Sequence, residues 1–372
     1  FEEINHFNLK EKKIKWERES SGPVGRLSTE GLDKVFEEFS KAIGIGSNAE
    51  YLKELFKKSY LEHSNLAKAT RFLANELFST EGLVIIDGDD RNLKTIFAPH
   101  IKDELIHQNS FKEVSKTIHQ LKDYTVQVNP REINLFYIED NLRERIVFED
   151  NIYKVNHTKI QFSESEILEA LHNSPEKFSP NVILRPLYQE VILPNLAYIG
   201  GGGEIAYWLE LKSNFENQKV TFPILMLRNS FVVATEKQLE KMEKLQITWS
   251  DLFLPQEELF QLKTKELSSI KIDFSEQKET LQKQFSDLLK IAAQTDKSFL
   301  GAVKAQEAKQ LKGLENLEKR LLKAEKRVHS EKLERIVTIQ NQLFTNRSLQ
   351  ERKNNFSEFY SKEFIKNVVS LS

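Results

Sequence analysis

The sequence predicts an α/β protein with a C-terminal antiparallel coiled coil. Three observations favour this class. Short apolar runs typical of strands alternate with helical periodicity, four glycines join a strand pattern to a helix pattern, and the composition changes abruptly near residue 257. Because alternating strands and helices are typical of a largely parallel sheet, we expect an α/β core over residues 1–255.

Helices dominate the start of the chain. Apolar residues recur at helical spacing over 32–43, with Ser28 and Thr29 as candidate caps and Gly44 as a stop signal. A second helical series follows over 66–77. The apolar run 83–86 then predicts a buried strand that ends in an acidic turn at 87–90.

The middle of the chain alternates between the two periods. A helical pattern covers 111–121, and Ser163 with Glu166 forms a capping box before another helix. Further strands are expected at 125–128, 135–138, 146–148, 196–199 and 224–227.

Residues 256–346 carry the coiled-coil pattern. Leu267, Phe274, Leu281 and Leu288 repeat every seven residues, and a second seam follows with a slip after its last member. That seam is Leu314, Leu317, Leu321, Ala324 and Val328. Cap residues at 294–298 favour a hairpin of two helices of about 40 residues each; the alternative is one continuous helix that dimerises in parallel. The aromatic tail, 347–372, is expected to return to the core.

Composition excludes several classes of function. The 372 residues include 54 Lys and Arg against 56 Asp and Glu, and this balance does not support a general nucleic-acid or membrane-surface binder. The chain has no cysteine, which excludes disulfides, Cys-ligated zinc and a cysteine nucleophile. We expect neither a membrane helix nor a signal peptide, and a cytoplasmic location fits.

The run Gly200, Gly201, Gly202 and Gly203 is the sharpest local signal, since the chain has only 13 glycines. At a strand-to-helix turn, glycines let a ligand approach the backbone, and free N–H groups favour phosphate or carboxylate. The motif is neither a P-loop nor GxGxxG, because no Gly-Lys-Ser/Thr follows and Ile205 holds the third position. The alternative is a tight turn without a ligand.

Residues near the glycines are candidates for ligand contacts. Glu204 is suited to orient an amine, and Tyr207 and Trp208 to stack on a base or sugar, although core packing is the alternative for Trp208. A polar cluster in an apolar stretch needs either partners or a ligand. Its members are Arg185, Tyr188, Gln189 and Glu190. Anion contacts are expected after the strand at 224–227, from Arg228, Asn229 and Ser230, with an exposed Arg as the alternative.

No metal site is identifiable from the sequence. The acidic turn at 87–90 lacks EF-hand spacing, and such turns are common for backbone reasons. The eight histidines show neither HExxH nor paired metal spacing, and no GxSxG nucleophile elbow is present.

Longer motifs resemble the BshC family, the cysteine ligases of bacillithiol biosynthesis. LRPLYQEVILPNLAYIGGGGEIAYWLELKSNFE, FPILMLRNS and LQERKNNFSEFY carry the resemblance, and FEEINH, SGPVGRL and GLVIIDGDDRNLK fit it, so it covers essentially the whole chain. The family's Gly-Pro-Gly-Glu block here reads Gly-Gly-Gly-Glu at 201–204, which should loosen the turn without changing its role. The family is expected to begin upstream of FEEINH, with part of the core and a nucleotidyltransferase-type motif there.

The resemblance implies a Rossmann-like, nucleotidyltransferase-type core with helical connecting segments and an antiparallel coiled coil that mediates a homodimer. The implied reaction is amide formation between the cysteine carboxyl and the amine of malyl-glucosamine, with ATP or ADP as the nucleotide and no metal identified. In this reading the glycine turn and Arg228 bind anions, while Glu204 or Glu190 positions the amine or accepts its proton. The remaining site candidates, taken from FEEINH and the tail motif, are His6, Gln350, Glu351 and Arg352.

Two other classes remain open on sequence. One is a non-catalytic scaffold in which a coiled coil is attached to an α/β domain. The other is a nucleic-acid binder that uses the Lys-rich stretch 304–332 as an arm, although the interleaved Glu residues favour a solvated helical face.

Overall fold

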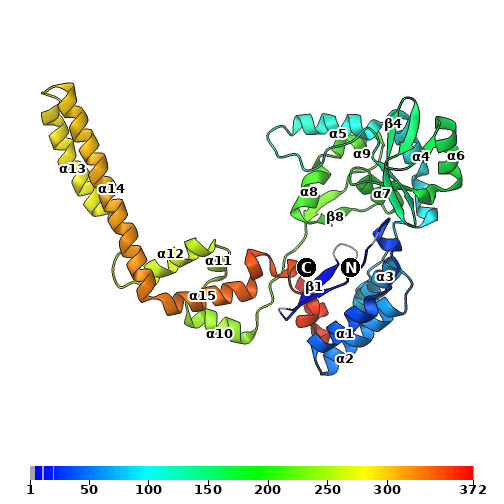
Figure 1. Cartoon of the computed structure of the whole chain (residues 1–372), viewed down its shortest axis with the longest axis horizontal. Coiled ribbons are helices and arrows are strands. Elements are labelled where there is room, and N and C mark those ends of the chain that lie inside the picture. Colours follow the sequence, from blue (N-terminus) through cyan, green and yellow to red (C-terminus); the bar gives the residue numbers. More distant parts are fainter. Residues whose placement is uncertain (1–4, 11, 20, 372) are drawn as a thin grey trace. The chain divides into compact units, whose positions relative to one another are not determined.

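The chain folds into two units. The computed structural model describes residues 5–10, 12–19 and 21–371, so the first four residues of the FEEINH motif lie outside the described residues. One unit comprises Phe1–Ser230 with Asn354–Ser372, and the other comprises Phe231–Lys353 (Figure 1). The units thus change after residues 230 and 353, whereas the sequence pattern placed the boundaries after residues 255 and 346. No described helix combines the length and apolarity needed to cross a membrane.

The first unit begins with a helical lobe. A hairpin of β1 (His6–Leu9) and β2 (Lys12–Lys15) packs with α1 (Leu32–Ile43), α2 (Ser47–Phe56) and α3 (Leu66–Phe78) around one apolar core. Gly44 follows α1 at a φ of 87°, as the stop signal predicts. The predicted caps are wrong, because Gly31 takes the N-cap position and the Thr29 hydroxyl donates to the carbonyl of His63.

A five-stranded antiparallel sheet forms the centre of the same unit. Its order is β6 (Gln161–Phe162), β5 (Ile152–Val155), β4 (Leu142–Glu149), β3 (Leu135–Glu139) and β7 (Phe178–Pro180). The sheet shares an apolar core with α4 (Arg91–His107), α5 (Asn109–Gln120), α6 (Glu164–Asn173) and α7 (Arg185–Ile192). The capping box of Ser163 and Glu166 begins α6 as predicted.

Only one pair of the described strands runs in parallel. β8 (Ala197–Gly200) pairs in parallel with β9 (Ile224–Leu227), and α8 (Gly202–Leu209) and α9 (Lys212–Asn217) lie between them in the chain. The expectation of a largely parallel sheet is therefore wrong for the larger sheet. Short connections join β3 to β4, β4 to β5 and β5 to β6 and so favour antiparallel pairing, and β7 also pairs antiparallel with β3.

Two predicted strands are absent from the described structure. Residues 83–86 have no strand partner, and Val84 is 75% exposed, so the predicted burial is wrong as well. Residues 125–128 also join no sheet. The buried Glu210 carboxylate accepts the N–H groups of Gln127 (2.7 Å) and Val128 (3.2 Å) and so replaces a neighbouring strand there.

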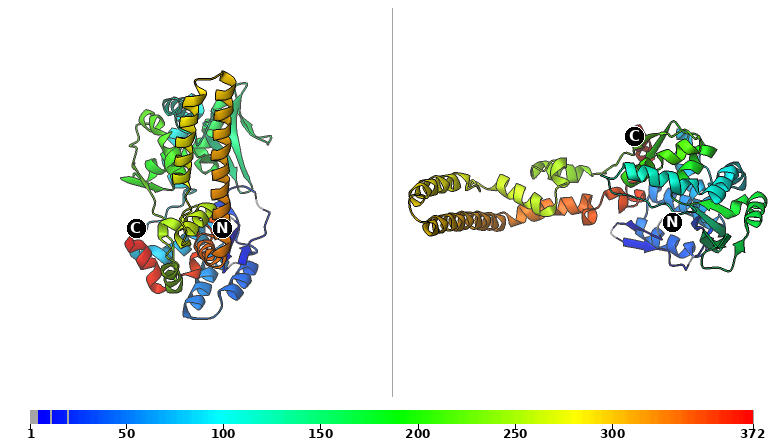
Figure 2. Two further views of the ribbon diagram at one scale, coloured as in Figure 1. Left: turned by 90° about the vertical axis from the view of Figure 1, so that its left-hand side faces the viewer. Right: turned by 90° about the horizontal axis from the view of Figure 1, so that it is seen from above.

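The second unit is helical and contains the predicted hairpin. Helices α13 (Ser275–Ala292) and α14 (Lys297–Val328) pack against each other in opposite directions (Figure 2). Asp296 caps α14 by accepting the N–H groups of Ser298 and Phe299. Helices α10 (Glu236–Lys244), α11 (Trp249–Leu252), α12 (Gln256–Leu267) and α15 (Ser330–Leu343) complete the unit.

The predicted coiled-coil arms are longer than the observed helices. Helix α13 has 18 residues and α14 has 32, because the first arm breaks between α12 and α13 and the second breaks at His329, where the seam slips. Phe285, Ala292 and Val303 form the hairpin core. The predicted seam residues Leu317 and Val328 are 52% and 71% exposed, so neither is buried within its own chain.

The chain re-enters the first unit at Asn354, which forms a parallel bridge with Asn8. The ring of Tyr360 stacks on that of Tyr51 with centroids 5.2 Å apart, and Phe356 packs against the core of the helical lobe. Helix α16 (Lys362–Leu371) ends the described chain. The shorter helical turns are η1 (Val24–Arg26), η2 (Lys57–Leu61), η3 (Ser79–Glu81), η4 (Pro175–Lys177), η5 (Thr345–Arg347), η6 (Gln350–Arg352) and η7 (Phe356–Glu358).

Candidate functional site

The glycine turn joins the end of β8 to the start of α8. A Cβ atom at Gly200 would lie 2.7 Å from Cε1 of Tyr198, so only glycine fits there without a shift. The Glu204 carboxylate accepts the Gly201 N–H at 2.6 Å and the Tyr198 hydroxyl at 3.3 Å. Glu204 therefore holds the turn closed, and the first-turn amides after Gly201 lack intrahelical acceptors.

Arg228 lies beside this turn. It follows β9, and its backbone N–H donates to the Gly200 carbonyl at 2.9 Å. Its side-chain Nε would lie 3.7 Å from a Cβ at Gly201. The parallel pairing of β8 with β9 thus brings a cation to the glycine turn, while Asn229 and Ser230 follow it as exposed residues.

The aromatic residues near the turn serve mainly as packing. Trp208 is 1% exposed and stacks on Tyr198 with centroids 3.9 Å apart, and it contacts Phe215 and Phe222 on its other sides. Burial raises the pKa of Tyr198 to about 12, so the phenol that donates to Glu204 stays protonated near neutral pH. Tyr207 is only partly buried and retains a surface that a ligand can contact.

Glu190 and the start of α7 have distinct surroundings. Glu190 is 3% exposed, and its carboxylate accepts from the backbone and the side-chain amide of Asn195, both at 2.9 Å. Arg185 is exposed and donates to Gln189 at 3.4 Å. Glu190 thus fixes the turn after α7, whereas Arg185 faces solvent at the helix start.

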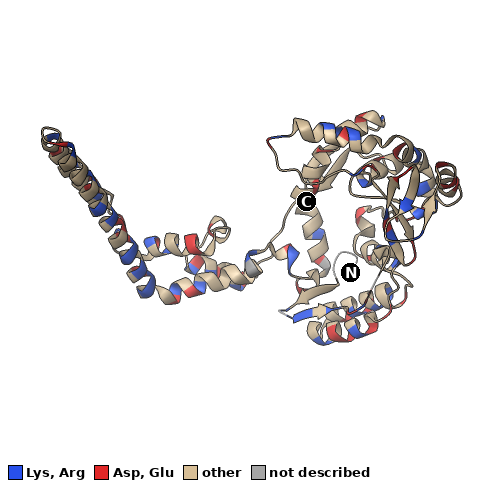
Figure 3. Cartoon of the chain, turned by 45° about the horizontal axis from the view of Figure 1, so that its top comes forward, with Lys and Arg blue, Asp and Glu red and all other residues tan. Residues whose placement is uncertain are grey.

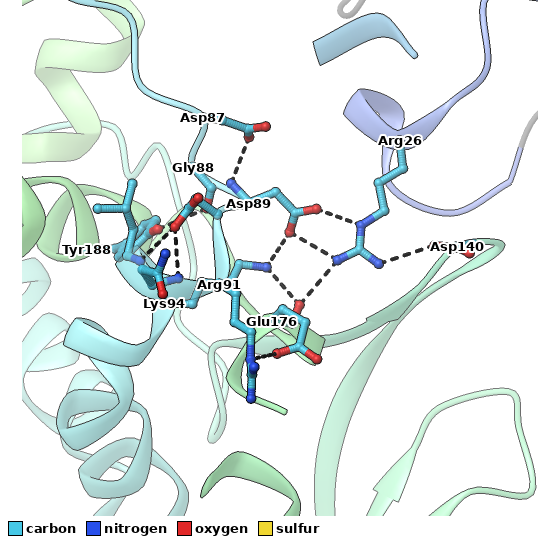
Figure 4. A network of polar contacts seen from close by, with 12 residues as sticks. Arg26, Asp87, Gly88, Asp89, Arg91, Lys94, Asp140, Glu176 and Tyr188 are labelled. Carbon is cyan, nitrogen blue, oxygen red and sulfur yellow. Dashed lines mark hydrogen bonds and ion pairs between the residues drawn. The ribbon is translucent and has the colours of Figure 1, made fainter. Parts of the chain in front are cut away.

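Tyr188 links α7 to the acidic turn. Its hydroxyl donates to the Gly88 carbonyl at 2.9 Å, and burial raises its pKa to about 12 (Figure 4). The guanidinium of Arg185 lies 5.9 Å from the Tyr188 ring centroid. Arg185 and Tyr188 also line a pocket of about 240 Å³ with Asp87, Gly88 and residues distant in sequence.

An ion network forms one wall of that pocket (Figure 4). Arg26 Nε donates to Asp89 at 2.6 Å, and Lys94, which is 2% exposed, pairs with the same carboxylate. Burial favours the neutral acid, but hydrogen bonds from Arg26 and Lys94 outweigh it and hold the pKa of Asp89 below its usual value. Sequence reasoning missed Arg26 and Lys94, although both lie in motifs that carry the family resemblance.

The acidic turn is used for structure. Asp89 carries the ion pairs, Asp90 caps α4 by accepting from Asn92 and Leu93, and Asp87 accepts the Asp89 N–H. Within the described ranges, no group of three or more His, Asp or Glu side chains is arranged to hold a metal ion.

The remaining candidates lie elsewhere in the fold. His6 lies on β1 and lines a different pocket, together with core residues of the helical lobe. Gln350 belongs to the second unit, where its amide both accepts from and donates to the backbone of Val233 at 2.8 and 3.0 Å. Glu351 accepts the Phe231 N–H at 3.3 Å in the same unit, and Arg352 follows in η6.

The fold combines a mixed α/β unit that carries the glycine turn with a helical unit built around an antiparallel hairpin. Residues 1–229 match the family model "Bacillithiol biosynthesis BshC, N-terminal Rossmann-like domain", and residues 231–372 match "Bacillithiol biosynthesis BshC, C-terminal coiled-coil domain". The chain belongs to the BshC family.

Relatives agree with this assignment over nearly the whole chain. Proteins named "Putative cysteine ligase BshC" from Flavobacterium psychrophilum and Flavobacterium johnsoniae are 66% and 63% identical over 360 residues. A protein of the same name from Christiangramia forsetii is 57% identical over 366 residues. Each alignment covers 97% of this chain and 68% of the relative's length.

Proposed function

We propose that this protein is a cysteine ligase of bacillithiol biosynthesis, which joins the carboxyl group of cysteine to the amine of malyl-glucosamine. The observation that carries the proposal is the match of both domains to BshC models, together with close relatives that bear the cysteine ligase name. The reaction class is C–N ligation.

Activation of the cysteine carboxylate by ATP is the second part of the proposal. A free carboxylate does not acylate an amine at a useful rate. Adenylation forms a mixed anhydride and releases pyrophosphate, whereas phosphorylation forms an acyl phosphate and releases ADP. The amine nitrogen then attacks the carbonyl carbon, the C–N bond forms, AMP or phosphate leaves, and a carboxylate accepts the amine proton.

The glycine turn and Arg228 are the proposed phosphate contacts. The turn offers first-turn amides of α8, and the Arg228 side chain lies beside Gly201, so a nucleotide phosphate would meet N–H donors and a cation together. Glu204 is the proposed proton acceptor, because its carboxylate lies at this turn. Glu190 is a weaker candidate, because it is buried and bound to Asn195, whereas Glu204 is exposed.

A homodimer in the cytoplasm completes the proposal. Several apolar side chains of the α13–α14 hairpin are exposed within one chain, and burying them needs a partner surface. These residues are Leu288 (46%), Ile291 (59%), Phe299 (48%), Leu317 (52%) and Val328 (71%). A second copy of the hairpin offers the matching apolar stripe.

The test is a direct assay with purified protein, malyl-glucosamine, cysteine and ATP, followed by mass spectrometry. We expect a product with a new amide, accompanied by AMP for the adenylate route or ADP for the acyl-phosphate route. Arg228→Ala and Glu204→Gln should each lower the rate by about 100-fold, because a phosphate contact and a proton acceptor are lost. The matched control is Arg145→Gln, which removes a cation from β4 and leaves the glycine turn and Arg228 unchanged.

Product formation without nucleotide consumption would refute ATP activation while leaving the ligase assignment in place. A folded protein that forms no product with any nucleotide, given verified substrates, would refute the ligase proposal itself.

A further inference from the structure

The pocket at the acidic turn has no lining residue in common with the glycine turn. It has a volume of about 240 Å³ and collects residues from η1, the 87–89 turn, β3, β4, β7 and α7. Its charged lining residues are Arg26, Asp87, Asp89, Lys94, Arg143 and Arg185. Six ionisable groups surround this small volume, so the way their charges are paired decides which of them can bind a ligand.

Two of the four cations already have a carboxylate partner. Asp89 accepts from both Arg26 and Lys94, and these two cations also donate to the backbone carbonyl of Glu176, at 3.3 and 2.9 Å (Figure 4). The network fixes this wall of the pocket before any ligand arrives. The carbonyl and carboxylate oxygens thus accept three hydrogen bonds from Arg26 and two from Lys94.

Arg143 and Arg185 have no such partners. Among the residues that the structure describes, neither guanidinium forms an ion pair with a carboxylate. Arg143 lies 3.8 Å from the centroid of the Phe136 ring, and Arg185 lies 5.9 Å from that of Tyr188. Contact with an aromatic face restrains a guanidinium and leaves its N–H edge available for an oxyanion.

Asp87 adds a charge of the opposite sign. Its carboxylate is exposed, and one oxygen accepts the Asp89 N–H at 2.9 Å. Among the described residues it pairs with no cation. The pocket therefore presents two guanidinium groups and one carboxylate that remain for a ligand.

We propose that this pocket binds a small ligand bearing two acidic oxyanion groups through Arg143 and Arg185, with Asp87 available to an amine of the same ligand. Carboxylate pairs and phosphates share this chemistry. Malyl-glucosamine carries two carboxylates and an amine, so it matches all three groups; this identification rests on the proposed function. A nucleotide phosphate is the other source of the oxyanions.

Isothermal titration of the whole chain with L-malate, malyl-glucosamine and inorganic pyrophosphate tests the proposal. Arg143→Gln and Arg185→Gln should each weaken binding of the oxyanion ligand by at least about tenfold, because a charge-assisted contact is lost. Arg143→Lys keeps the charge but loses the forked geometry, and it should be intermediate. Arg145→Gln lies on the same strand outside the pocket and should bind within about twofold of the native protein.

The three ligands distinguish the acceptor substrate from a nucleotide as the source of the oxyanion groups. Loss of malate and malyl-glucosamine binding in both variants assigns the pocket to the acceptor substrate, and loss of pyrophosphate binding alone assigns it to the nucleotide. Unchanged binding in both Gln variants, with unchanged thermal unfolding, overturns the proposal, as does the absence of binding by all three ligands. The ligase assay is run in parallel, so a chain that binds these anions without ligating cysteine contradicts the proposed function and not the pocket.

Discussion

Single residues of the glycine run have different reasons to be glycine. At Gly200 the Tyr198 ring occupies the space that a side chain would take, whereas a Cβ atom at Gly203 would meet no heavy atom within 4 Å. The run therefore contains one position fixed by close packing and at least one that is open. An open glycine inside a helix costs stability relative to alanine, so exposure of the backbone to a ligand is the better reason to retain it.

This difference predicts opposite effects of two small substitutions. Gly200→Ala should lower the free energy of unfolding by about 1–3 kcal/mol, because the new methyl displaces Tyr198 from Trp208. Gly203→Ala should raise it by about 0.5–1 kcal/mol, because alanine favours the helix. Urea unfolding followed by tryptophan fluorescence measures both. Equal effects of the two variants would contradict the assigned packing.

Helices and turns distant in sequence are tied together by the Asp89 network. Arg26 comes from η1, Lys94 from α4, and the carbonyl acceptor of both cations from Glu176 in η4. Lys94 is almost fully buried, and a buried cation without a partner is strongly destabilising. The acidic turn is thus a connector between elements as well as a wall of the pocket.

Asp89→Asn should lower the free energy of unfolding by about 3 kcal/mol at pH 7, since Lys94 loses its counter-charge. The pKa of Asp89 is lowered in the folded chain, so its contribution is fully present above the ordinary carboxyl pKa of about 4 and is lost as the pH falls through the lowered value. The difference between native protein and variant should therefore stay constant from pH 7 to about pH 5 and shrink below about pH 4.

Unfolding by denaturant over this pH range measures the effect. Adding Lys94→Met to Asp89→Asn removes the unpaired cation and should recover most of the lost stability. A difference that persists undiminished at the lowest pH would show that the ion pairs do not cause it.

At the scale of the whole molecule, the exposed apolar side chains of the hairpin point to assembly. Leu317 and Val328 lie on α14 with more than half of their surface exposed, and each would contribute about 1.5–3 kcal/mol if fully buried. Both were assigned to the coiled-coil seam by spacing. The proposed second copy gives these seam positions the burial that their own chain does not.

Leu317→Glu combined with Val328→Glu should convert the proposed dimer into a monomer of 43.4 kDa. Two charges at the contact would be buried without partners, and sedimentation equilibrium reports the mass directly. Gln306→Glu with Gln310→Glu adds the same charge at exposed polar positions of α14 and should leave the mass unchanged. A double variant with the native mass would contradict a contact through this part of the hairpin.

Local sequence pattern by itself determined several secondary-structure elements of this protein. Heptad spacing predicted the coiled coil, and the cap residues at 294–298 favoured its hairpin. The Ser163 capping box predicted the start of α6, and the glycine run marked the β8–α8 turn. These features depend on residues a few positions apart, so the backbone period and the capping chemistry are visible in the sequence itself.

Only the tertiary structure decided which polar residues are available for chemistry. The sequence by itself placed Glu190 and Glu204 among the catalytic candidates, but the fold buries Glu190 against Asn195 and leaves Glu204 exposed at the glycine turn. The sequence pattern assigned no role to Arg143. This residue lines the same pocket as Arg185 only because the fold brings β4 and α7 together. Burial, charge pairing and strand pairing depend on contacts between segments far apart in the chain, and local periodicity carries no information about them.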